Sequence, residues 1–329
     1  MSVRRRFGCF SVLCLAFGIL VSGCERARPV PRIDPELRNW SESYRVVDGL
    51  RIHVFQTGAI TLPEAVVFRG GSWFARRRMD VPAFVIEHPS AGLIVFDTGL
   101  GPQSDALWLA KLGMVRTWPA ADLASQMKKA GLGIDRVRYV VVSHMHFDHT
   151  GDLGAFPNAS IVTARGEQQE AVRSGEFGFY RAADWNGAAR WIEIDYAAGS
   201  PLGTFSSHHD LLGDGSVILV DLRGHTGGSQ GLLIRALGGP VLLTGDAAWV
   251  HESWSYAARP IWADDMDAWW GQIWRIKKLV DRVPALMVIP GHDLSRVRRT
   301  ERDDIEIHRF EAAQRVVLDG TIGGPSVKP

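Results

Sequence analysis

The sequence Ser143-His144-Met145-His146-Phe147-Asp148-His149 places three histidines and one aspartate within six consecutive positions. It directly follows Val137-Arg138-Tyr139-Val140-Val141-Val142, whose apolar, β-branched residues are typical of a buried strand. Imidazole is a frequent ligand of zinc and iron, and a neighbouring carboxylate adds an oxygen ligand. We therefore predict a metal site at the end of this strand. His144 and His146 would face one side, while Asp148 and His149 would come from the turn beyond.

Three further side chains occur in the same setting, each after a short apolar stretch and a glycine: His225 in Arg223-Gly224-His225-Thr226-Gly227-Gly228-Ser229, Asp246 in Leu243-Thr244-Gly245-Asp246, and His292 in Ile289-Pro290-Gly291-His292-Asp293. Glycine permits backbone conformations that are closed to other residues, so a side chain just past a strand can be turned over a site. Any one of these residues alone would more often be structural. Together, and in this order, they predict further ligands of one site.

These motifs resemble those of the metallo-β-lactamase superfamily. Val95-Phe96-Asp97-Thr98-Gly99 is similar to the first motif of the family, and His144 to His149 are similar to the second. His225, Asp246 and His292 match the third, fourth and fifth. The resemblance implies an α/β fold, specifically a four-layer αββα sandwich. It is closest to the N-acyl-homoserine lactonase-like members, through Gly224-His225-Thr226-Gly227-Gly228-Ser229-Gln230, Leu242-Leu243-Thr244-Gly245-Asp246-Ala247-Ala248 and Gly291-His292-Asp293.

The resemblance also implies a role for each ligand. His144, His146 and His225 would hold one divalent ion. Asp148, His149 and His292 would hold a second ion, and Asp246 would bridge the two. Two such ions repel each other unless anions lie between them, and they convert bound water into a nucleophile near neutral pH. Asp148 and Asp246 are therefore the candidate catalytic residues. Zinc is the expected metal, with iron, manganese or cobalt as alternatives because these ligands accept all of them.

The implied reaction is hydrolysis of a lactone similar to an N-acyl-homoserine lactone, by attack of a metal-bridging hydroxide. Another carboxylic-ester or thioester hydrolase, similar to glyoxalase II, is an alternative. A β-lactamase fits less well, since those enzymes generally lack the bridging carboxylate that Asp246 supplies. A non-catalytic binding module also fits less well, because a site without activity has no physical reason to keep all seven ligands.

Aromatic residues suggest where a substrate would bind. Trp249 and Trp254 closely follow Asp246, and Trp73 and Phe74 lie in a stretch rich in glycine and arginine. We expect these side chains to line a pocket for the apolar part of a neutral ester or lactone. Some lactonases carry a tyrosine three residues after the bridging aspartate, where this chain has Trp249, whose indole N–H donates a hydrogen bond but does not shuttle a proton. Whether Trp249 or the nearby Tyr256 replaces that tyrosine stays open at this point.

Alternating apolar and amphipathic segments indicate strands interleaved with helices. We predict a hairpin formed by residues 83–88 and 92–97, and helices over residues 119–130 and 264–280. The stretch Ser206 to Gly215, which contains the pair His208-His209, is predicted to be a polar turn away from the site.

The N-terminal region predicts export. Arg4-Arg5-Arg6 precedes an apolar run from Phe7 to Val21 that is short for a membrane span, a pattern typical of a secretory signal. Val21-Ser22-Gly23-Cys24 resembles a bacterial lipobox, which implies a lipid on Cys24 and association with a membrane. We thus expect a signal peptide at 1–23, a linker at 24–43, a hydrolase domain at 44–319 and a flexible tail at 320–329. The protein would be a periplasmic or outer-membrane-anchored lipoprotein, with an uncleaved anchor as the alternative.

Composition limits the remaining possibilities. The 37 basic residues nearly balance the 36 acidic ones, so no strong field exists to attract nucleic acid. No cysteine follows Cys24, which excludes disulfides and thiolate metal ligands from the expected hydrolase domain. The expected partner is therefore a small lactone or ester, while the sequence leaves the oligomeric state undecided.

Overall fold

The computed structural model describes residues 32–40, 46–102, 104, 111, 113–188, 190–297 and 304–308. The expected signal peptide, residues 24–31 of the linker, both expected ends of the hydrolase domain and the tail lie outside the described residues. From Ile33 onward, the described residues belong to one compact unit. Within the ranges described, we find no helix with the length and hydropathy that a membrane span requires.

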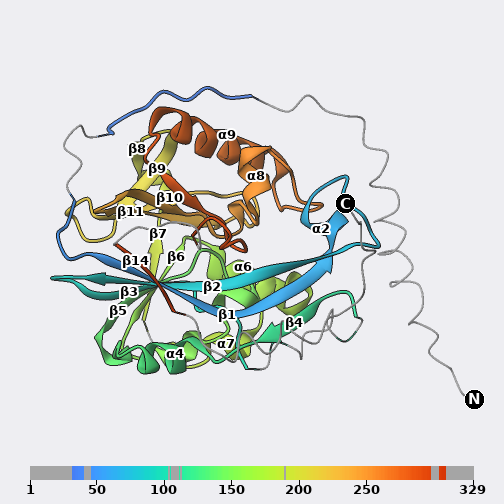
Figure 1. Cartoon of the computed structure of the whole chain (residues 1–329), viewed down its shortest axis with the longest axis horizontal. Helices are drawn as coiled ribbons and strands as arrows, with labels where there is room; N and C mark the ends of the chain where they lie inside the picture. Colours follow the sequence, from blue (N-terminus) through green and yellow to red (C-terminus); the bar gives the residue numbers. More distant parts are fainter. Residues whose placement is uncertain are drawn as a thin grey trace, which may run out of the picture. The chain divides into compact units, whose positions relative to one another are not determined.

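The first β-sheet has eight strands in the spatial order β14-β1-β2-β3-β5-β6-β7, with β4 paired to β1 (Figure 1). Its strands are β1 (Arg51–Pro63), β2 (Arg76–His88), β3 (Gly92–Phe96), β4 (Arg116–Pro119), β5 (Val137–Val141), β6 (Ser160–Ala164), β7 (Arg190–Ile194) and β14 (Ile305–His308). Strands β3, β5, β6 and β7 run parallel, whereas β2 is antiparallel to both β1 and β3. The carboxyl ends of the parallel strands β3 and β5 therefore lie at the same edge of the first sheet.

The second β-sheet has six strands in the order β13-β12-β11-β10-β9-β8. They are β8 (Ser200–Leu202), β9 (Phe205–Asp210), β10 (Val217–Asp221), β11 (Gln230–Ala236), β12 (Gly239–Leu243) and β13 (Met287–Ile289). The described α-helices are α2 (Glu64–Val67), α4 (Leu123–Lys129), α5 (Phe147–Thr150), α6 (Glu167–Ser174), α7 (Ala182–Trp185), α8 (His251–Ser255) and α9 (Met266–Arg282). The described 3₁₀ turns are η3 (Ile134–Arg136), η4 (Leu153–Ala155), η5 (Gly175–Gly178), η6 (Tyr196–Ala198) and η7 (Gly245–Ala247).

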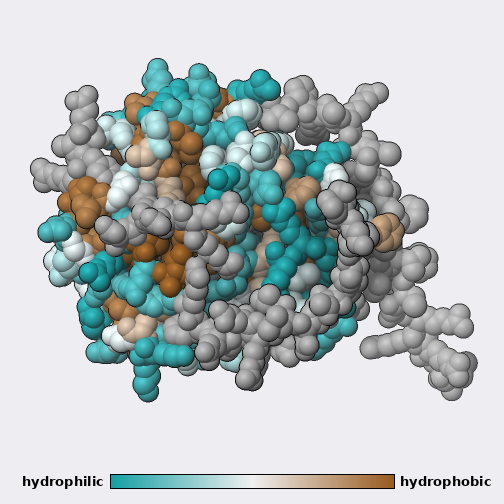
Figure 2. Space-filling model, viewed as in Figure 1, coloured by the Kyte–Doolittle hydropathy of each residue, from teal (hydrophilic) through white to brown (hydrophobic). Residues whose placement is uncertain are grey.

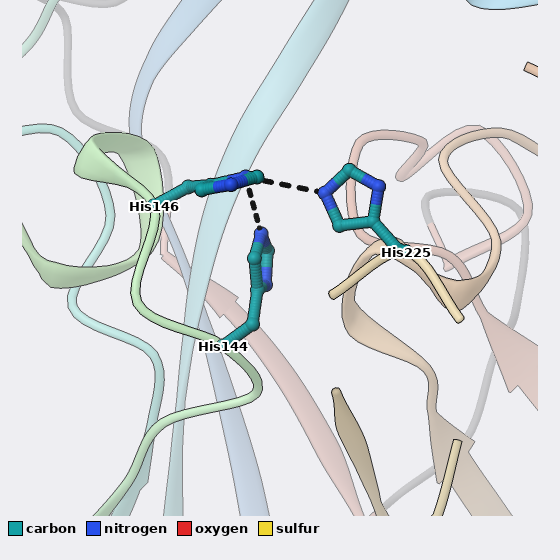
Figure 3. Close-up of side chains that lie close together, drawn as sticks. All are labelled: His144, His146 and His225. Atoms are coloured by element: carbon teal, nitrogen blue, oxygen red, sulfur yellow. Dashed lines mark hydrogen bonds between the residues drawn. The ribbon is translucent and has the colours of Figure 1, made fainter. Parts of the chain in front are cut away.

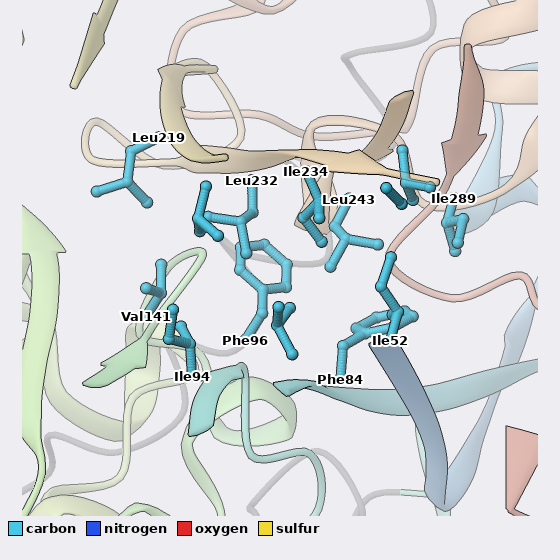
Figure 4. Packing of buried hydrophobic residues seen from close by; sticks show 14 of the residues in the cluster. Ile52, Phe84, Ile94, Phe96, Val141, Leu219, Leu232, Ile234, Leu243 and Ile289 are labelled. Carbon is cyan, nitrogen blue, oxygen red and sulfur yellow. The ribbon is translucent and has the colours of Figure 1, made fainter. Parts of the chain in front are cut away.

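A hydrophobic core lies between the two sheets. Figure 4 shows Ile94 and Phe96 of β3 pointing toward Leu232 of the second sheet. Because successive strand residues point to opposite faces, Leu93 and Val95 face the other way and pack against α4. Burial on both faces explains why these strands are almost continuously apolar. On the face drawn in Figure 2, hydrophilic residues cover much of the coloured surface, and hydrophobic residues gather over the strands at the left of the view.

Helix α9 covers the outer face of the second sheet. Its buried side chains Trp269, Ile273 and Ile276 pack against Ile218 and Val220 of β10. With α4 on the outer face of the first sheet, the layers follow the order helix, sheet, sheet, helix (Figure 1). The α/β class and the αββα sandwich expected from the sequence are thereby confirmed.

Most predicted elements agree with the structure, and two differ. The hairpin is confirmed as β2 and β3, and the helix predicted at 264–280 is α9, whose N-cap Asp265 accepts a hydrogen bond from Ala268 N–H. The helix predicted at 119–130 begins only at Leu123, because residues 116–119 form β4 against β1 and Asp122 caps α4. The polar turn predicted at 206–215 is wrong up to Asp210, because β9 pairs with β10 there.

Candidate metal centre

The seven predicted ligands converge at one edge of the sandwich, and both sheets contribute. His144 and His146 follow β5, Asp148 and His149 lie in α5, and His225 lies in the loop from β10 to β11. Asp246 lies in η7 after β12, and His292 follows β13. All seven are buried: His144, His146, Asp148, His149, His225, Asp246 and His292. Short loops after strands hold each side chain on a rigid scaffold, so the geometry of the sheets determines that of the site.

Three imidazoles form the first cluster (Figure 3). Nε2 of His144 lies 2.9 Å from Nδ1 of His146, and Nε2 of His225 lies 3.2 Å from the same atom. Burial lowers the pKa of His144 and of His146 well below the ordinary value, and lowers the pKa of His225 to about 4. These rings are therefore neutral at neutral pH, the state in which imidazole binds a metal.

The second cluster consists of Asp148, His149 and His292, whose ligand atoms lie within 4.8 Å of one another. Nε2 of His292 is 3.5 Å from Oδ2 of Asp148, and Nε2 of His149 is 3.8 Å from Oδ1 of the same carboxyl. Two imidazoles and a carboxylate are again a donor set that suits zinc, iron, manganese or cobalt.

Asp246 lies between the two clusters and presents one oxygen to each. Its Oδ1 is 3.1 Å from Nε2 of His292 and 3.2 Å from Nε2 of His149. Its Oδ2 is 3.4 Å from Nε2 of His225 and 3.8 Å from Nε2 of His144. Burial acts to raise the pKa of Asp246, but His292 and His149 hold it well below the ordinary value. An ionised carboxylate in this position can be shared by two cations.

Partners on the far side of the imidazoles determine which nitrogen faces the centre. Nδ1 of His149 lies 2.8 Å from Oδ2 of Asp97, whose Oδ1 accepts a hydrogen bond from Ser143 N–H. Nδ1 of His292 lies 2.8 Å from the backbone carbonyl of Asp80. Both contacts hold an N–H on Nδ1, so Nε2 of each ring faces the cluster and can bind a metal ion once it gives up its proton. Asp97 thus supports His149 from behind and ties it to the end of β5.

Glu167, at the start of α6, connects two of the ligand loops and was not found by sequence reasoning. Its carboxylate accepts hydrogen bonds from Met145 N–H (2.9 Å), Thr226 Oγ1 (3.0 Å) and Gly228 N–H (3.0 Å). It therefore joins the loop of His144 and His146 to the loop of His225. Burial raises the pKa of Glu167 to about 7. A glutamate in the first turn of a helix is too common to have predicted this role.

Two glycines leave the space that the centre needs. A Cβ atom at position 291 would lie 2.5 Å from Oδ1 of Asp246. Gly245 has a φ of +50°, and a Cβ there would lie 2.5 Å from Cβ of Ser143. Side chains at either position would displace the central carboxylate or the strand end beside it.

The donor atoms fit divalent metal ions. Two imidazole nitrogens lie 2.9 and 3.2 Å from the single Nδ1 of His146, which can share a proton with only one of them at a time. Imidazole nitrogens without a shared proton direct their lone pairs at one another, and these repel in a buried site. A cation bound between the nitrogens removes that repulsion. Oδ1 of Asp246 is likewise buried and forms no hydrogen bond with any described residue.

Aromatic rings surround the histidines. The ring centroid of Trp249 lies 5.6 Å from that of His225, and the centroid of Trp262 lies 5.5 Å from the same ring. The rings of Phe179 and Trp262 lie 5.6 and 6.1 Å from that of His146. Sequence reasoning had proposed Trp249 for the pocket but neither Trp262 nor Phe179, because their proximity depends on how loops far apart in the chain pack together.

The other proposed pocket residues lie elsewhere. Trp254 packs on His251 with ring centroids 4.9 Å apart, and 80% of Tyr256 is exposed. Trp73 and Phe74 are 52% and 98% exposed, in the loop between α2 and β2. Among the described residues, none of the four has a ring contact with the clustered histidines. Trp249, rather than Tyr256, therefore occupies the position beside the ligands.

Comparison with known proteins identifies the family. Residues 76–292 match the Metallo-beta-lactamase superfamily. The chain belongs to the metallo-β-lactamase superfamily. The family expected from the sequence is thus confirmed, and the protein is a metal-dependent hydrolase whose clusters of histidine and aspartate suit divalent metals.

Relatives within the superfamily include N-acyl homoserine lactonases. The chain is 29% identical to the N-acyl homoserine lactonase AttM of Azorhizobium caulinodans, over 74% of this chain and 93% of the relative. It is 30% identical to AttM of Rhizobium radiobacter, over 64% of this chain and 81% of that protein. A solved N-acyl homoserine lactone hydrolase, with N-hexanoyl-L-homoserine bound at its catalytic metal centre, has a TM-score of 0.65 at 23% identity, covering 78% of this chain and 98% of that one. The structural likeness shows a shared fold.

Proposed function

We propose that this protein is a dinuclear metal hydrolase that opens lactones of the N-acyl-homoserine lactone class. The observation that carries the proposal is the position of Asp246, whose two oxygens face two separate ligand clusters. A carboxylate shared by two clusters distinguishes the site from that of a typical β-lactamase, as the presence of Asp246 in the sequence had suggested. The relatives that match most of this chain's length are lactonases, which supports the choice of substrate.

The seven ligands would bind two ions, most simply zinc. His144, His146 and His225 would hold one ion, while Asp148, His149 and His292 would hold the other. When bound, the pair would lower the pKa of a water between them toward about 7 and polarise the lactone carbonyl. Asp148 would orient the attacking water, and Asp246 would keep both ions in place.

Trp249 would bind the polar end of the substrate. Its Nε1 is buried and forms no hydrogen bond with any described residue, although the ring lies beside His225 and His292. A buried N–H donor without an acceptor costs free energy, unless a ligand atom accepts its hydrogen bond. We infer that the indole N–H donates to the carbonyl or ring oxygen of the lactone, in place of the tyrosine that some lactonases use.

Trp262 and Phe179 would bind the apolar part of the substrate. Their ring centroids lie 6.2 Å apart, at the rim of the first cluster. Because 40% of Trp262 is exposed, its ring offers apolar surface to a molecule that reaches the cluster. An acyl chain bound there would gain roughly 0.8 kcal/mol for each buried methylene group.

The test is a panel of N-acyl-homoserine lactones, other lactones, simple esters, thioesters and a β-lactam, given to protein loaded with zinc. We expect lactones to be hydrolysed fastest, and chelation followed by dialysis to abolish turnover. Preference for a thioester would favour the hydrolase class similar to glyoxalase II. Full activity after chelation, with metal removal verified by elemental analysis, would contradict the mechanism.

We also propose that the protein is an exported lipoprotein anchored through Cys24. The proposal rests on the basic start, the short apolar run and the lipobox-like Val21-Ser22-Gly23-Cys24. Expression of the full chain in a Gram-negative host with labelled palmitate should label the wild type and the control Cys14→Ala, but not Cys24→Ala. Equal labelling of all three proteins, or none, would reject the anchor.

A further inference from the structure

A second group of metal-binding side chains lies on the first sheet, outside the candidate metal centre. It consists of His53 on β1 and of Glu306 and His308 on the edge strand β14. His53 is paired in register with Glu306, and His308 follows two residues later, so all three side chains lie on the same face of the sheet. This is the outer face, because Phe55, two residues after His53, belongs to the core beneath α4.

The three donor atoms of this group lie close together. Nδ1 of His53 is 3.0 Å from Nε2 of His308 and 3.3 Å from Oε2 of Glu306. His53 is 4% exposed, so its imidazole is held rigidly, whereas the carboxylate of Glu306 is 55% exposed. The ring of His308 stacks on Phe55, with centroids 4.3 Å apart and an angle of 5° between the planes. Two imidazoles are thus fixed by packing, with a carboxylate beside them.

A fourth side chain orients the central imidazole. Oε2 of Glu87 lies 3.4 Å from Nε2 of His53, and Oε1 of Glu87 accepts a hydrogen bond from Arg136. Burial acts to raise the pKa of Glu87, but Arg136 and His53 hold it below the ordinary value. The ionised carboxylate therefore favours the tautomer of His53 with its proton on Nε2. The lone pair of Nδ1 is then directed toward His308 and Glu306. A carboxylate behind a ligating histidine is the usual support of a metal-bound imidazole.

Two carboxylates approach the imidazole of His53. Oε2 of Glu306 lies 3.3 Å from its Nδ1, and Oε2 of Glu87 lies 3.4 Å from its Nε2. A divalent ion bound between the three donor atoms would balance this negative charge.

We propose that His53, Glu306 and His308 form a second site for a divalent transition-metal ion, most simply zinc, separate from the candidate metal centre. Two nitrogens and one carboxylate oxygen are a donor set that zinc commonly accepts, with water completing the coordination. Among the described strands, β14 has four residues and pairs with β1 alone, so an ion shared by the two strands would hold it in register. The role we assign to this site is structural.

The experiment compares zinc content among matched variants of the full chain. Each protein is stripped with a chelator, reloaded with excess zinc, passed through a desalting column and analysed for zinc per chain. The variants are His308→Ala and the milder Glu306→Gln, with His209→Ala on β9 as the control for loss of an exposed histidine. We expect wild type and His209→Ala to retain one more ion per chain than His308→Ala, with Glu306→Gln binding that ion more weakly.

Activity and stability provide a second measurement. Thermal unfolding of the wild type should shift upward when zinc is raised beyond the amount that restores full activity, and this shift should be absent in His308→Ala. The specific activity of Glu306→Gln should equal that of the wild type. Equal zinc content in all four proteins would overturn the proposal. So would an extra ion that the desalting step removes from the wild type. Because the comparison is a difference between variants, it does not depend on how many ions the candidate metal centre holds.

Discussion

Oδ1 of Asp246 lies 3.1 Å from Nε2 of His292, while Oδ2 of the same carboxylate lies 3.4 Å from Nε2 of His225. One side chain therefore joins the ligands of two clusters that come from different loops. In the proposed dinuclear site, this carboxylate would hold two cations at a fixed separation and offset their repulsion.

Replacing the carboxylate of Asp246 should leave the two clusters without a ligand in common. In Asp246→Asn, an amide nitrogen would face either imidazoles or a metal ion, and the negative charge would be lost. We expect bound metal to fall below two ions per chain and kcat to drop by at least about 100-fold. Elemental analysis and lactone turnover measure both effects, with Asp267→Asn on the exposed side of α9 as the control. Wild-type metal content and rate in Asp246→Asn would refute the bridging role.

Trp249 should act through its N–H group. Trp249→Phe keeps an aromatic ring beside His225 but removes the donor, so kcat/KM should fall about 2- to 10-fold, the value of one hydrogen bond. Trp249→Tyr restores a donor and should recover part of the loss. The fall should be similar for short and long acyl chains, because the polar end of the substrate is unchanged between them. If Trp249→Phe and wild type have the same kcat/KM, the indole N–H has no role in the reaction.

Trp262 should determine preference for the acyl chain. Trp262→Ala removes apolar surface beside His146 and His225. KM should rise more for substrates with long chains than for those with short ones, since each buried methylene contributes roughly 0.8 kcal/mol. The matched control is Trp118→Ala on β4, a tryptophan of similar exposure that lies near Arg78. An equal rise in KM across chain lengths would exclude Trp262 from the acyl pocket.

Glu167 should support metal binding and make stability depend on pH. Glu167→Gln places an amide N–H against a backbone or hydroxyl donor, so metal affinity should fall about 10- to 100-fold, as for other residues that position ligands. The pKa of Glu167 is raised from 4.5 to about 7, so the folded state binds the proton more tightly than the unfolded state does. The contribution of this group to stability is then largest at low pH and declines as pH rises from about 4.5 to 7.

Chelated wild type should therefore lose more unfolding free energy over that pH window than chelated Glu167→Gln. Denaturant titrations at several pH values measure the difference. Glu170→Gln, a partly exposed glutamate on the same helix that forms an ion pair with Arg173, serves as the control. Parallel curves for wild type and Glu167→Gln would show that Glu167 does not titrate in this range.

The ligand residues could be predicted from sequence because each follows a strand that is recognisable by its apolar run. Val137 to Val142 precede His144 and His146, and Leu286 to Ile289 precede His292. Parallel strands end at a common edge, so residues just beyond them come together wherever the sheet forms. Glu167, Trp262 and Phe179 have no such local signal. Their proximity to the histidines depends on how the loops pack, which short-range patterns do not encode.

The sequence by itself indicated an α/β fold and the seven side chains that converge, because periodicity and motif spacing are local properties, and the resemblance of its motifs to a known superfamily implied the sandwich. The tertiary structure decided how they are arranged. Only the approach of the two sheets directs the oxygens of Asp246 to different clusters and places Trp249, rather than Tyr256, beside the ligands. Only the pairing of β14 with β1 brings His308 to His53. Contacts between residues far apart in the chain form when the core between the sheets is buried, and the hydrophobic effect that drives this burial has no direction of its own.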